Sequence, residues 1–327
     1  MMPEGHRAQP GGLILDGSEA PGTVRALAQA ADEAGGTLWI ACHLFRRDPI
    51  TLAAMALAAT SRLGVALMAL SPYSVHPVFA TMAAATLDEY FPGRVQLCFG
   101  VGAPRDLAAA GIAAPRPLST LAEAIEIARA LLDGETMAFR GERFQVAGRS
   151  LATGPRNIPI LLTASGPRML ELAGKLADGV VISAASSPEF VAWSLEQVRR
   201  GETASLRHIR AIGLVQTSVG GDERRAHDRL RRNLGFILRG AHHARNLALA
   251  GTQLDQAALA AAFAREDWVE VDVLVTDDVV SRHAASGTVE RVAQALARYR
   301  EVGLDEIVLA GVTDPETLRR LMTRYDE

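Results

Sequence analysis

The feature of this sequence that most constrains its fold is an eightfold alternation of short apolar runs and longer segments with helical spacing. The runs are apolar throughout, as expected of strands buried on both faces of a parallel sheet. Eight such units in 327 residues predict a (β/α)8 barrel, with an open doubly wound sheet as the alternative. The strands are expected at 13–15, 37–41, 63–70, 95–99, 160–163, 180–183, 209–217 and 306–309.

The segments between these strands have apolar residues spaced three and four apart and ordinary helix stops, such as Gly35-Gly36. A small β-hairpin is expected over 137–146, where apolar residues alternate. The region 222–266 is expected to be helical, with an interruption near Gly251. The other helices are expected at 22–34, 50–60, 78–90, 118–132, 168–176, 189–199, 288–299 and 315–325.

Composition argues against several classes of partner. The formal net charge is −3 and like charges do not gather in blocks, so we expect neither a nucleic-acid nor a membrane-surface partner. No apolar run reaches the roughly 18–20 residues that a bilayer requires, and residues 1–11 lack the apolar core of a secretory signal. These residues are expected to be a disordered lead-in, followed by a single domain over 12–327. The two cysteines are too few for a disulfide framework, which favours the reducing cytoplasm.

The scarcity of lysine argues against catalysis through a lysine Schiff base. Lys175 is the only lysine of the chain, and it stands within a helical pattern. Schiff-base catalysis needs a lysine amine at the reacting carbon. Pyridoxal phosphate and Schiff-base aldolase functions are therefore disfavoured.

Polar residues and glycines follow several expected strands, where the ligands of a parallel barrel bind. His43 follows 37–41 and could transfer a proton, or it could simply cap the next helix. Gly100-Val101-Gly102 could admit a flat ligand, although a plain turn gives the same pattern. The run Thr163–Pro167 opens a helix whose free amides, with Arg168, could hold an anion, or it is an ordinary capped helix start.

Several well-known catalytic and binding motifs are absent from the sequence. There is no Ser-His-Asp elbow, no phosphate-binding Walker motif and no His/Cys cluster with metal-ligand spacing. His242 and His243 are adjacent, so their side chains diverge on a helix and make a poor metal site. We therefore predict no metal.

Taken together, four segments resemble the bacterial-luciferase-like superfamily of flavin- and F420-dependent oxidoreductases, in particular the branch around methylenetetrahydromethanopterin reductase. The resemblance extends from about Leu13 to Leu321 and implies a (β/α)8 barrel with an insertion after the seventh strand. The segments are LWIACHLFRRDP, SPYSVHPVFATMAAATLDEYFPGRVQLCFGVG, IPILLTASGPRMLELAGKLADGVVIS and SGTVERVAQALARYREVGLDEIVLAG.

The resemblance also implies site residues. His43 would be the imidazole near the reactive face of the cofactor ring, and Met68–Ala69 would be a non-proline cis peptide beneath it. The other residues expected at the cofactor are Ser71, Val101, Gly102, Ala103, Asp106, Ser165, Gly166, Arg168 and Met169, with Ser183 and Ser186 nearer the substrate or the phosphate.

Two positions depart from the pattern of the F420 enzymes. They commonly have an aspartate before the histidine, where this chain has Cys42, and an acid after the glycine loop, where it has Ala103. A thiolate at Cys42 would need electropositive surroundings. Cys42 and Asp106 are the alternatives for a proton path, so Cys42 joins His43 as a candidate catalytic residue.

Three functions fit this resemblance. The leading one is F420-dependent hydride transfer to or from a small organic substrate. The alternatives are an FMN-dependent monooxygenase supplied by a partner flavin reductase, and a cofactor-binding barrel without redox turnover. The helices 50–60 and 78–90 are rich in small residues, and the family usually dimerises there, so a homodimer is expected.

Overall fold

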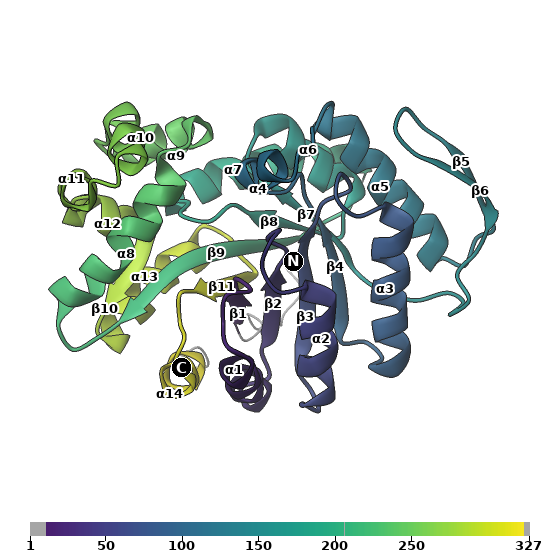
Figure 1. The fold of residues 1–327 in the computed structure, drawn as a ribbon, viewed down its shortest axis with the longest axis horizontal. Coiled ribbons are helices and arrows are strands. Elements are labelled where there is room, and N and C mark those ends of the chain that lie inside the picture. Colours follow the sequence, from purple (N-terminus) through teal and green to yellow (C-terminus); the bar gives the residue numbers. More distant parts are fainter. Residues whose placement is uncertain (1–10, 206, 324–327) are drawn as a thin grey trace, which may run out of the picture. The chain divides into compact units, whose positions relative to one another are not determined.

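The computed structural model describes residues 11–205 and 207–323 (Figure 1). The chain forms two compact units. The first unit holds Ile14–Val181 and Gln197–Ile209, and the second holds the chain through Leu13, Ile182–Glu196 and the chain from Arg210 onward. The lead-in expected over 1–11 falls almost entirely outside the described residues, and the single-domain assignment stays a prediction.

The strand pairings confirm the barrel that the alternating pattern predicts. The strands pair in the order β10, β9, β11, β1, β2, β3, β4, β7, β8, and β8 also pairs with β9. That last pairing closes a ring of eight strands, with β10 added outside β9. The fold is therefore a (β/α)8 barrel and not an open doubly wound sheet.

The chain from β1 to α7 alternates strands and helices, as predicted. The strands are β1 (Gly12–Leu15), β2 (Thr37–Ala41), β3 (Gly64–Leu70), β4 (Val95–Phe99), β7 (Ile160–Ala164) and β8 (Gly179–Ile182). The helices are α1 (Pro21–Glu33), α2 (Pro49–Ala58), α3 (Pro77–Tyr90), α4 (Pro104–Ala109), α5 (Pro117–Leu132), α6 (Pro167–Leu176) and α7 (Pro188–Ser205). The expected hairpin is present as β5 (Met137–Arg140) and β6 (Gln145–Arg149).

Proline at the first position starts each of these helices, which sets where every strand-to-helix loop ends. Its fixed φ suits the first turn, and it has no N–H to leave unpaired there. Side chains complete two of the caps: Asp48 accepts from the Thr51 N–H at 2.7 Å, and the His76 Nδ1 accepts from the Val78 N–H at 3.2 Å. His76-Pro77 thus begins α3, one residue before the start of the helix expected over 78–90.

The remaining elements follow β9. They are β9 (Arg210–Val219), α8 (Glu223–Leu238), η1 (Ala241–His243), α9 (Ala244–Ala250), α10 (Gln256–Ala264), α11 (Trp268–Leu274), α12 (Asp277–His283), β10 (Ala284–Gly287), α13 (Val289–Glu301), β11 (Glu306–Ala310) and α14 (Pro315–Thr323). Helices α8 to α12 form the insertion that the resemblance implied after the seventh barrel strand.

The insertion differs in detail from the expected helical region over 222–266. Gly251 ends α9 with a left-handed backbone, so the predicted interruption is present. The chain also breaks near Gly240 and at Asp267, which caps α11 through its carboxylate. Strand β10 was not predicted, because its four residues, AASG, contain no apolar run.

The core of the first unit is made by strands that are buried along nearly their whole length. Trp39, Leu67, Leu97 and Phe99 have no exposed surface. Helices α2 and α3 pack against β3 and β4 and run alongside them in Figure 1. Within the described residues, no helix is both long enough and apolar enough to cross a membrane.

Candidate active site

The strand registers of the first unit bring four loops to one edge of the sheet. Ala41 lies opposite Met68, Leu70 opposite Phe99, and Phe99 opposite Leu162. The residues that follow β2, β3, β4 and β7 therefore meet at this carboxyl edge. This is the end of a parallel barrel where ligands bind.

At the end of β3 the peptide bond between Met68 and Ala69 is cis, as the resemblance implied. The β3–β4 register shifts at this point, between Leu67 and Leu70. The Met68 carbonyl accepts from the Cys42 N–H at 2.7 Å, which ties the end of β2 to the irregular end of β3. Ala69 is half-buried at the edge, and its contact with a cofactor stays a prediction.

Gly100, directly after β4, is a glycine because the neighbouring strands leave no room for a side chain. A Cβ there would lie 2.3 Å from the Thr163 Oγ1 and 2.8 Å from the Ala69 Cβ. The Thr163 hydroxyl itself donates to the Phe99 carbonyl at 3.5 Å. The glycine thus permits close packing of the ends of β3, β4 and β7, a role that the sequence pattern did not distinguish from a plain turn.

Ser71 joins the loop after β3 to the loop after β4. Its hydroxyl donates to the Val101 carbonyl at 2.6 Å and accepts from the Tyr73 N–H at 3.3 Å. Gly102 has φ +93°, and a Cβ there would approach the Ser71 side chain to 3.2 Å. Ser71 is 3% exposed and its proton is already committed, so its direct effect here is to shape the edge.

His43 and Asp106 are the titratable pair of this edge. The His43 Nδ1 lies 3.3 Å from the Asp106 Oδ2, and both side chains are partly exposed, at 40% and 26%. A carboxylate accepts from Nδ1–H, which leaves Nε2 as the nitrogen that can exchange a proton with a ligand. The structure thus brings together two residues that are 63 positions apart in the sequence.

The carboxylate comes from a helix that the sequence analysis did not anticipate. Ala103 is the N-cap residue of α4, and Asp106 lies in the first turn of that helix. Ala103 cannot act as an acid, but the half-turn that follows it returns a carboxylate to His43. Ala103 stands where the F420 enzymes commonly have an acid, but Asp106 supplies this edge with an acidic side chain.

Cys42 is a neutral thiol at neutral pH. Burial, with a smaller contribution from the nearby Asp48 and Asp106 carboxylates, raises the pKa of Cys42 to about 11. The electropositive surroundings that a thiolate would need are absent from the described neighbours of this residue. A catalytic role for Cys42 stays a prediction, and it would have to use the protonated thiol.

The start of α6 is the anion-binding candidate. Gly166 is its N-cap residue, and a Cβ there would meet nothing within 4 Å, so the backbone is openly accessible. Ser165 and Met169 are half-buried, and Arg168 is exposed. An open helix N-terminus with an adjacent guanidinium is suited to a phosphate group.

Two of the arginines near this edge serve the loop after β1. Arg46 pairs with Asp16 at 2.5 Å, and Arg47 donates to the Gly17 carbonyl at 3.1 Å. These contacts engage both guanidinium groups within the protein. Arg168 remains the cation best placed at the α6 start.

Ser183 and Ser186 lie in the second unit, in the turn between β8 and α7. The Ser186 hydroxyl donates to the Ser183 carbonyl at 2.7 Å, and the two hydroxyls lie 3.4 Å apart. Ser186 is 3% exposed and Ser183 is half-buried. Their expected contact with substrate or phosphate stays a prediction.

Comparison with known proteins identifies the family of this chain. A model of the luciferase-like monooxygenase family matches residues 4–306. The chain belongs to this family. It is 28% identical over 294 residues to 5,10-methylenetetrahydromethanopterin reductase of Archaeoglobus fulgidus, with 88% of each chain covered.

Two solved structures extend the comparison of this luciferase-like chain. One is the coenzyme F420-dependent tetrahydromethanopterin reductase of Methanopyrus kandleri, with a TM-score of 0.87, 21% identity, and 95% of this chain and 96% of that one covered. The other is an F420-dependent secondary alcohol dehydrogenase in complex with an F420-acetone adduct, with a TM-score of 0.80, 18% identity, and 97% and 99% covered. Both confirm the fold.

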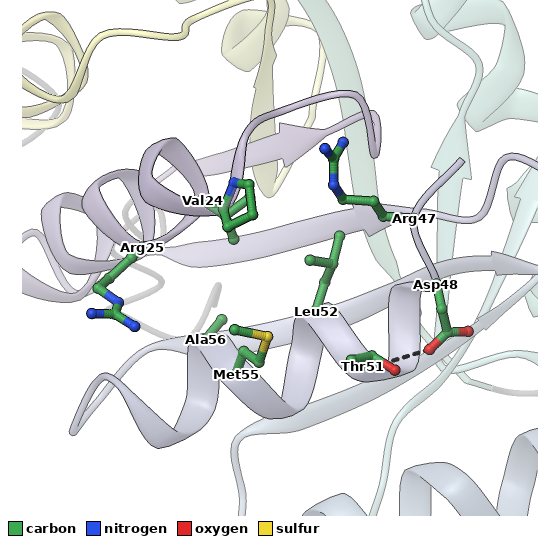
Figure 2. A pocket seen from close by; sticks show the side chains of 9 residues that line it. Val24, Arg25, Arg47, Asp48, Thr51, Leu52, Met55 and Ala56 are labelled. Carbon is green, nitrogen blue, oxygen red and sulfur yellow. Dashed lines mark hydrogen bonds between the residues drawn. The ribbon is translucent and has the colours of Figure 1, made fainter. Parts of the chain in front are cut away.

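A pocket of about 310 Å³ in the first unit includes Arg47 and Asp48, from the loop after β2, in its lining. Figure 2 shows it between α1 and α2, with Leu52 and Met55 along its side and Arg25 and Arg47 at its two ends. None of the predicted site residues lines it. We place the chemistry at the carboxyl edge because the polar and titratable groups converge there.

No group of three or more His, Cys, Asp or Glu side chains is arranged to hold a metal ion in the part of the chain that the structure describes. His242 and His243 stack with ring centroids 4.3 Å apart. The candidate site of this luciferase-like protein combines an imidazole, a carboxylate, a thiol and an open helix start.

Proposed function

We propose that this luciferase-like protein is an F420-dependent oxidoreductase that transfers a hydride between the deazaflavin and a small organic substrate. The observation that carries the proposal is the convergence of the His43–Asp106 pair and the cis Met68–Ala69 bond on one edge of the first unit. The named relatives support F420 in particular, since they are F420-dependent or act in the same reductase class.

The donor set of the first unit fits such a cofactor. The half-buried Ala69 and the glycines after β4 leave backbone, not bulky side chains, at the edge, which suits a flat ring. The open α6 start with Gly166 and Arg168 suits a phosphate. When bound, F420 would supply a hydride donor or acceptor at its ring.

The residues of this chain would supply binding, orientation and a proton. Asp106 would hold and orient His43 through Nδ1–H, so that Nε2 can give a proton to the atom that becomes anionic, or take one from it. Positioning of ring and substrate against each other would supply much of the remaining acceleration.

The first test is titration of the purified protein with F420 and with FMN, followed by absorbance and fluorescence. Tight F420 binding with weak FMN binding supports hydride chemistry and directs screening to imines, enones and secondary alcohols. Preference for FMN supports the monooxygenase alternative and a search for a reductase partner. Binding of neither cofactor contradicts both functions.

The second test addresses the proton. His43→Ala should lower kcat by about 10²–10⁴-fold, the usual contribution of a general acid or base, and leave the cofactor Kd within about threefold. Asp106→Asn should lower kcat less than His43→Ala, because the carboxylate acts on the imidazole and not on the substrate. His208→Ala, at a histidine with an 85% exposed side chain, is the matched control. Unchanged turnover in His43→Ala would eliminate the catalytic role.

A further inference from the structure

Polar side chains connect the end of strand β9 to helix α8, which packs against β9 and β10 in the second unit (Figure 1). The Asn233 Nδ2 donates to the Gln216 Oε1 at 2.7 Å. The Arg229 Nε donates to the Ser218 Oγ at 3.0 Å. Because two residues of a strand span about 7 Å and residues four apart share a helix face, these two contacts lie side by side.

The guanidinium of Arg229 is held in one orientation although the residue is exposed. Besides the Nε bond to Ser218, its Nη2 donates to the Val219 carbonyl at 2.7 Å. A Cβ on Gly220 would lie 2.7 Å from the same Nη2, so the missing side chain of Gly220 leaves the space that the guanidinium occupies. Both N–H groups of Nη1 and one of Nη2 then remain for a ligand.

The charge of Arg229 is not neutralised by an acidic side chain among the described residues. The acids at this end of α8 are paired with other arginines, namely Asp222 with Arg225, Glu223 with Arg291 and Asp228 with Arg231. Arg229 is therefore a fixed cation that can pair with an anion from outside the chain.

Two further donors beside Arg229 have no acceptor in the part of the chain that the structure describes. Gln216 is 5% exposed, and its Nε2 has no partner there, although its Oε1 is bonded to Asn233. Ser218 is 7% exposed, and its Oγ accepts from Arg229 without donating its own proton to a described residue. Since an unpaired donor at a buried residue is costly, these two groups need an acceptor that the chain does not supply.

The chemistry of this set of groups indicates the kind of ligand. Gln216, Ser218 and Arg229 offer an amide N–H, a hydroxyl and one edge of a guanidinium, and all of these can donate. Both strand residues stand in the last four positions of β9, at the carboxyl end where parallel barrels bind ligands. A set of donors with one fixed positive charge suits an oxyanion.

We propose that Gln216, Ser218 and Arg229 form a binding site for an oxyanion group, a carboxylate or a phosphate, of a small organic ligand. We name it the oxyanion site. The free edge of Arg229 takes two oxygens of the anion, and the amide and the hydroxyl donate to its other lone pairs. The oxyanion site goes beyond the proposed function, because it consists of residues of the second unit and requires no particular cofactor.

The test uses two small probes on the full-length protein: acetate for a carboxylate and inorganic phosphate for a phosphate, with chloride at equal ionic strength as the reference. The protein is labelled with ¹⁵N-arginine, and the Nε–H resonance of Arg229 is assigned by its loss in Arg229→Lys. At least one probe should shift this resonance with saturation and a Kd on the order of 1–10 mM. The tighter probe identifies the anion. A shift that is linear and equal for all three salts is a general ionic effect and would overturn the site.

Two neighbouring glycines provide matched variants. Gly220→Ala places a methyl group where the guanidinium lies and keeps every charge, so it should weaken probe binding at least about tenfold. Gly221→Ala adds the same methyl group where nothing lies within 4 Å, and it should change the Kd less than about twofold. Gln216→Leu removes the free amide at similar volume and should weaken binding about threefold to tenfold, the effect of one neutral hydrogen bond.

The outcomes test the oxyanion site apart from the proposed function. Equal probe affinity in wild type and Gly220→Ala would overturn the role of Arg229, and equal losses in the two glycine variants would overturn the geometric argument. Unchanged F420 affinity in Gly220→Ala supports a ligand other than the cofactor, whereas a loss equal to that of the probes shows that the cofactor itself provides the oxyanion. If wild type binds the probes but not F420, the proposed function fails and the oxyanion site stands.

Discussion

Gly100 shows how a single missing side chain shapes the carboxyl edge of the first unit. The nearest atoms, on Thr163 and Ala69, belong to two neighbouring strands, so a methyl group has nowhere to go. Gly100→Ala should destabilise the protein by about 1–3 kcal/mol through overpacking and disturb the edge as well. Denaturant unfolding measures the loss.

Gly22 is the matched control for this substitution. It lies in the first turn of α1, and a Cβ there would meet nothing within 4 Å. Gly22→Ala should leave stability unchanged or raise it by up to about 1 kcal/mol, because it reduces the freedom of the unfolded chain. Equal effects of the two substitutions would contradict the packing argument.

The thiol of Cys42 gives a second test at the residue scale. With its pKa raised to about 11, Cys42 should react with iodoacetamide at pH 8 at least about tenfold more slowly than free cysteine. The rate should increase about tenfold per pH unit up to pH 10, as the thiolate fraction does. Cys42→Ser gives the background from the fully buried Cys98. A fast reaction at pH 7 would show that the surroundings are electropositive after all.

At the scale of elements, the insertion contains histidines that are buried in their neutral form. Burial lowers the pKa of His283 to about 4 and that of His243 to about 3, with neighbouring histidine charge contributing at His243. These values lie below the ordinary 6.5, so the unfolded chain binds protons that the folded chain does not. The free energy of unfolding should therefore fall as the pH falls below about 6.5.

The loss at pH 5 should be about 2 kcal/mol for each of these two histidines. Urea unfolding between pH 7 and pH 5 measures it, with His283→Asn compared with wild type. The variant cannot take up that proton, so its stability should depend less on pH. If the free energy of unfolding depended on pH equally in wild type and His283→Asn, this result would contradict the burial of a neutral His283 ring.

At the scale of the whole molecule, the helices α2 and α3 expose large apolar side chains to solvent. Met55 is 51% exposed on α2, and on α3 Phe79 is 51% and Met82 44% exposed. Such a patch is typical of an interface. We therefore retain the expectation of a homodimer through these helices.

Light scattering of the purified protein should give the mass of a dimer. Phe79→Glu combined with Met82→Glu should shift it to a monomer, because two charges cannot be buried against a second apolar face. Val269→Glu, at a residue that is 76% exposed on α11, is the control and should remain dimeric. A monomeric wild type would exclude the expected assembly.

Much of this protein follows from the sequence by itself. The apolar runs indicate buried parallel strands, since strands buried on both faces must be apolar at every position, and their number favours a barrel over an open sheet. Proline-started helices locate the loops, the residues that follow the strands locate His43 and the α6 start, and the family resemblance implies the cis bond at Met68–Ala69. These are local signals, in which neighbouring residues carry the information.

Only the tertiary structure decided which distant groups meet. Asp106 reaches His43 because the β2, β3 and β4 registers align their carboxyl ends and a short helix follows. Asn246 and His283 hydrogen-bond to the turn between β8 and α7 across 59 to 98 residues of chain. Neither contact has a sequence period or a fixed spacing, because a hydrogen bond depends on positions in space that the packing of the whole fold sets.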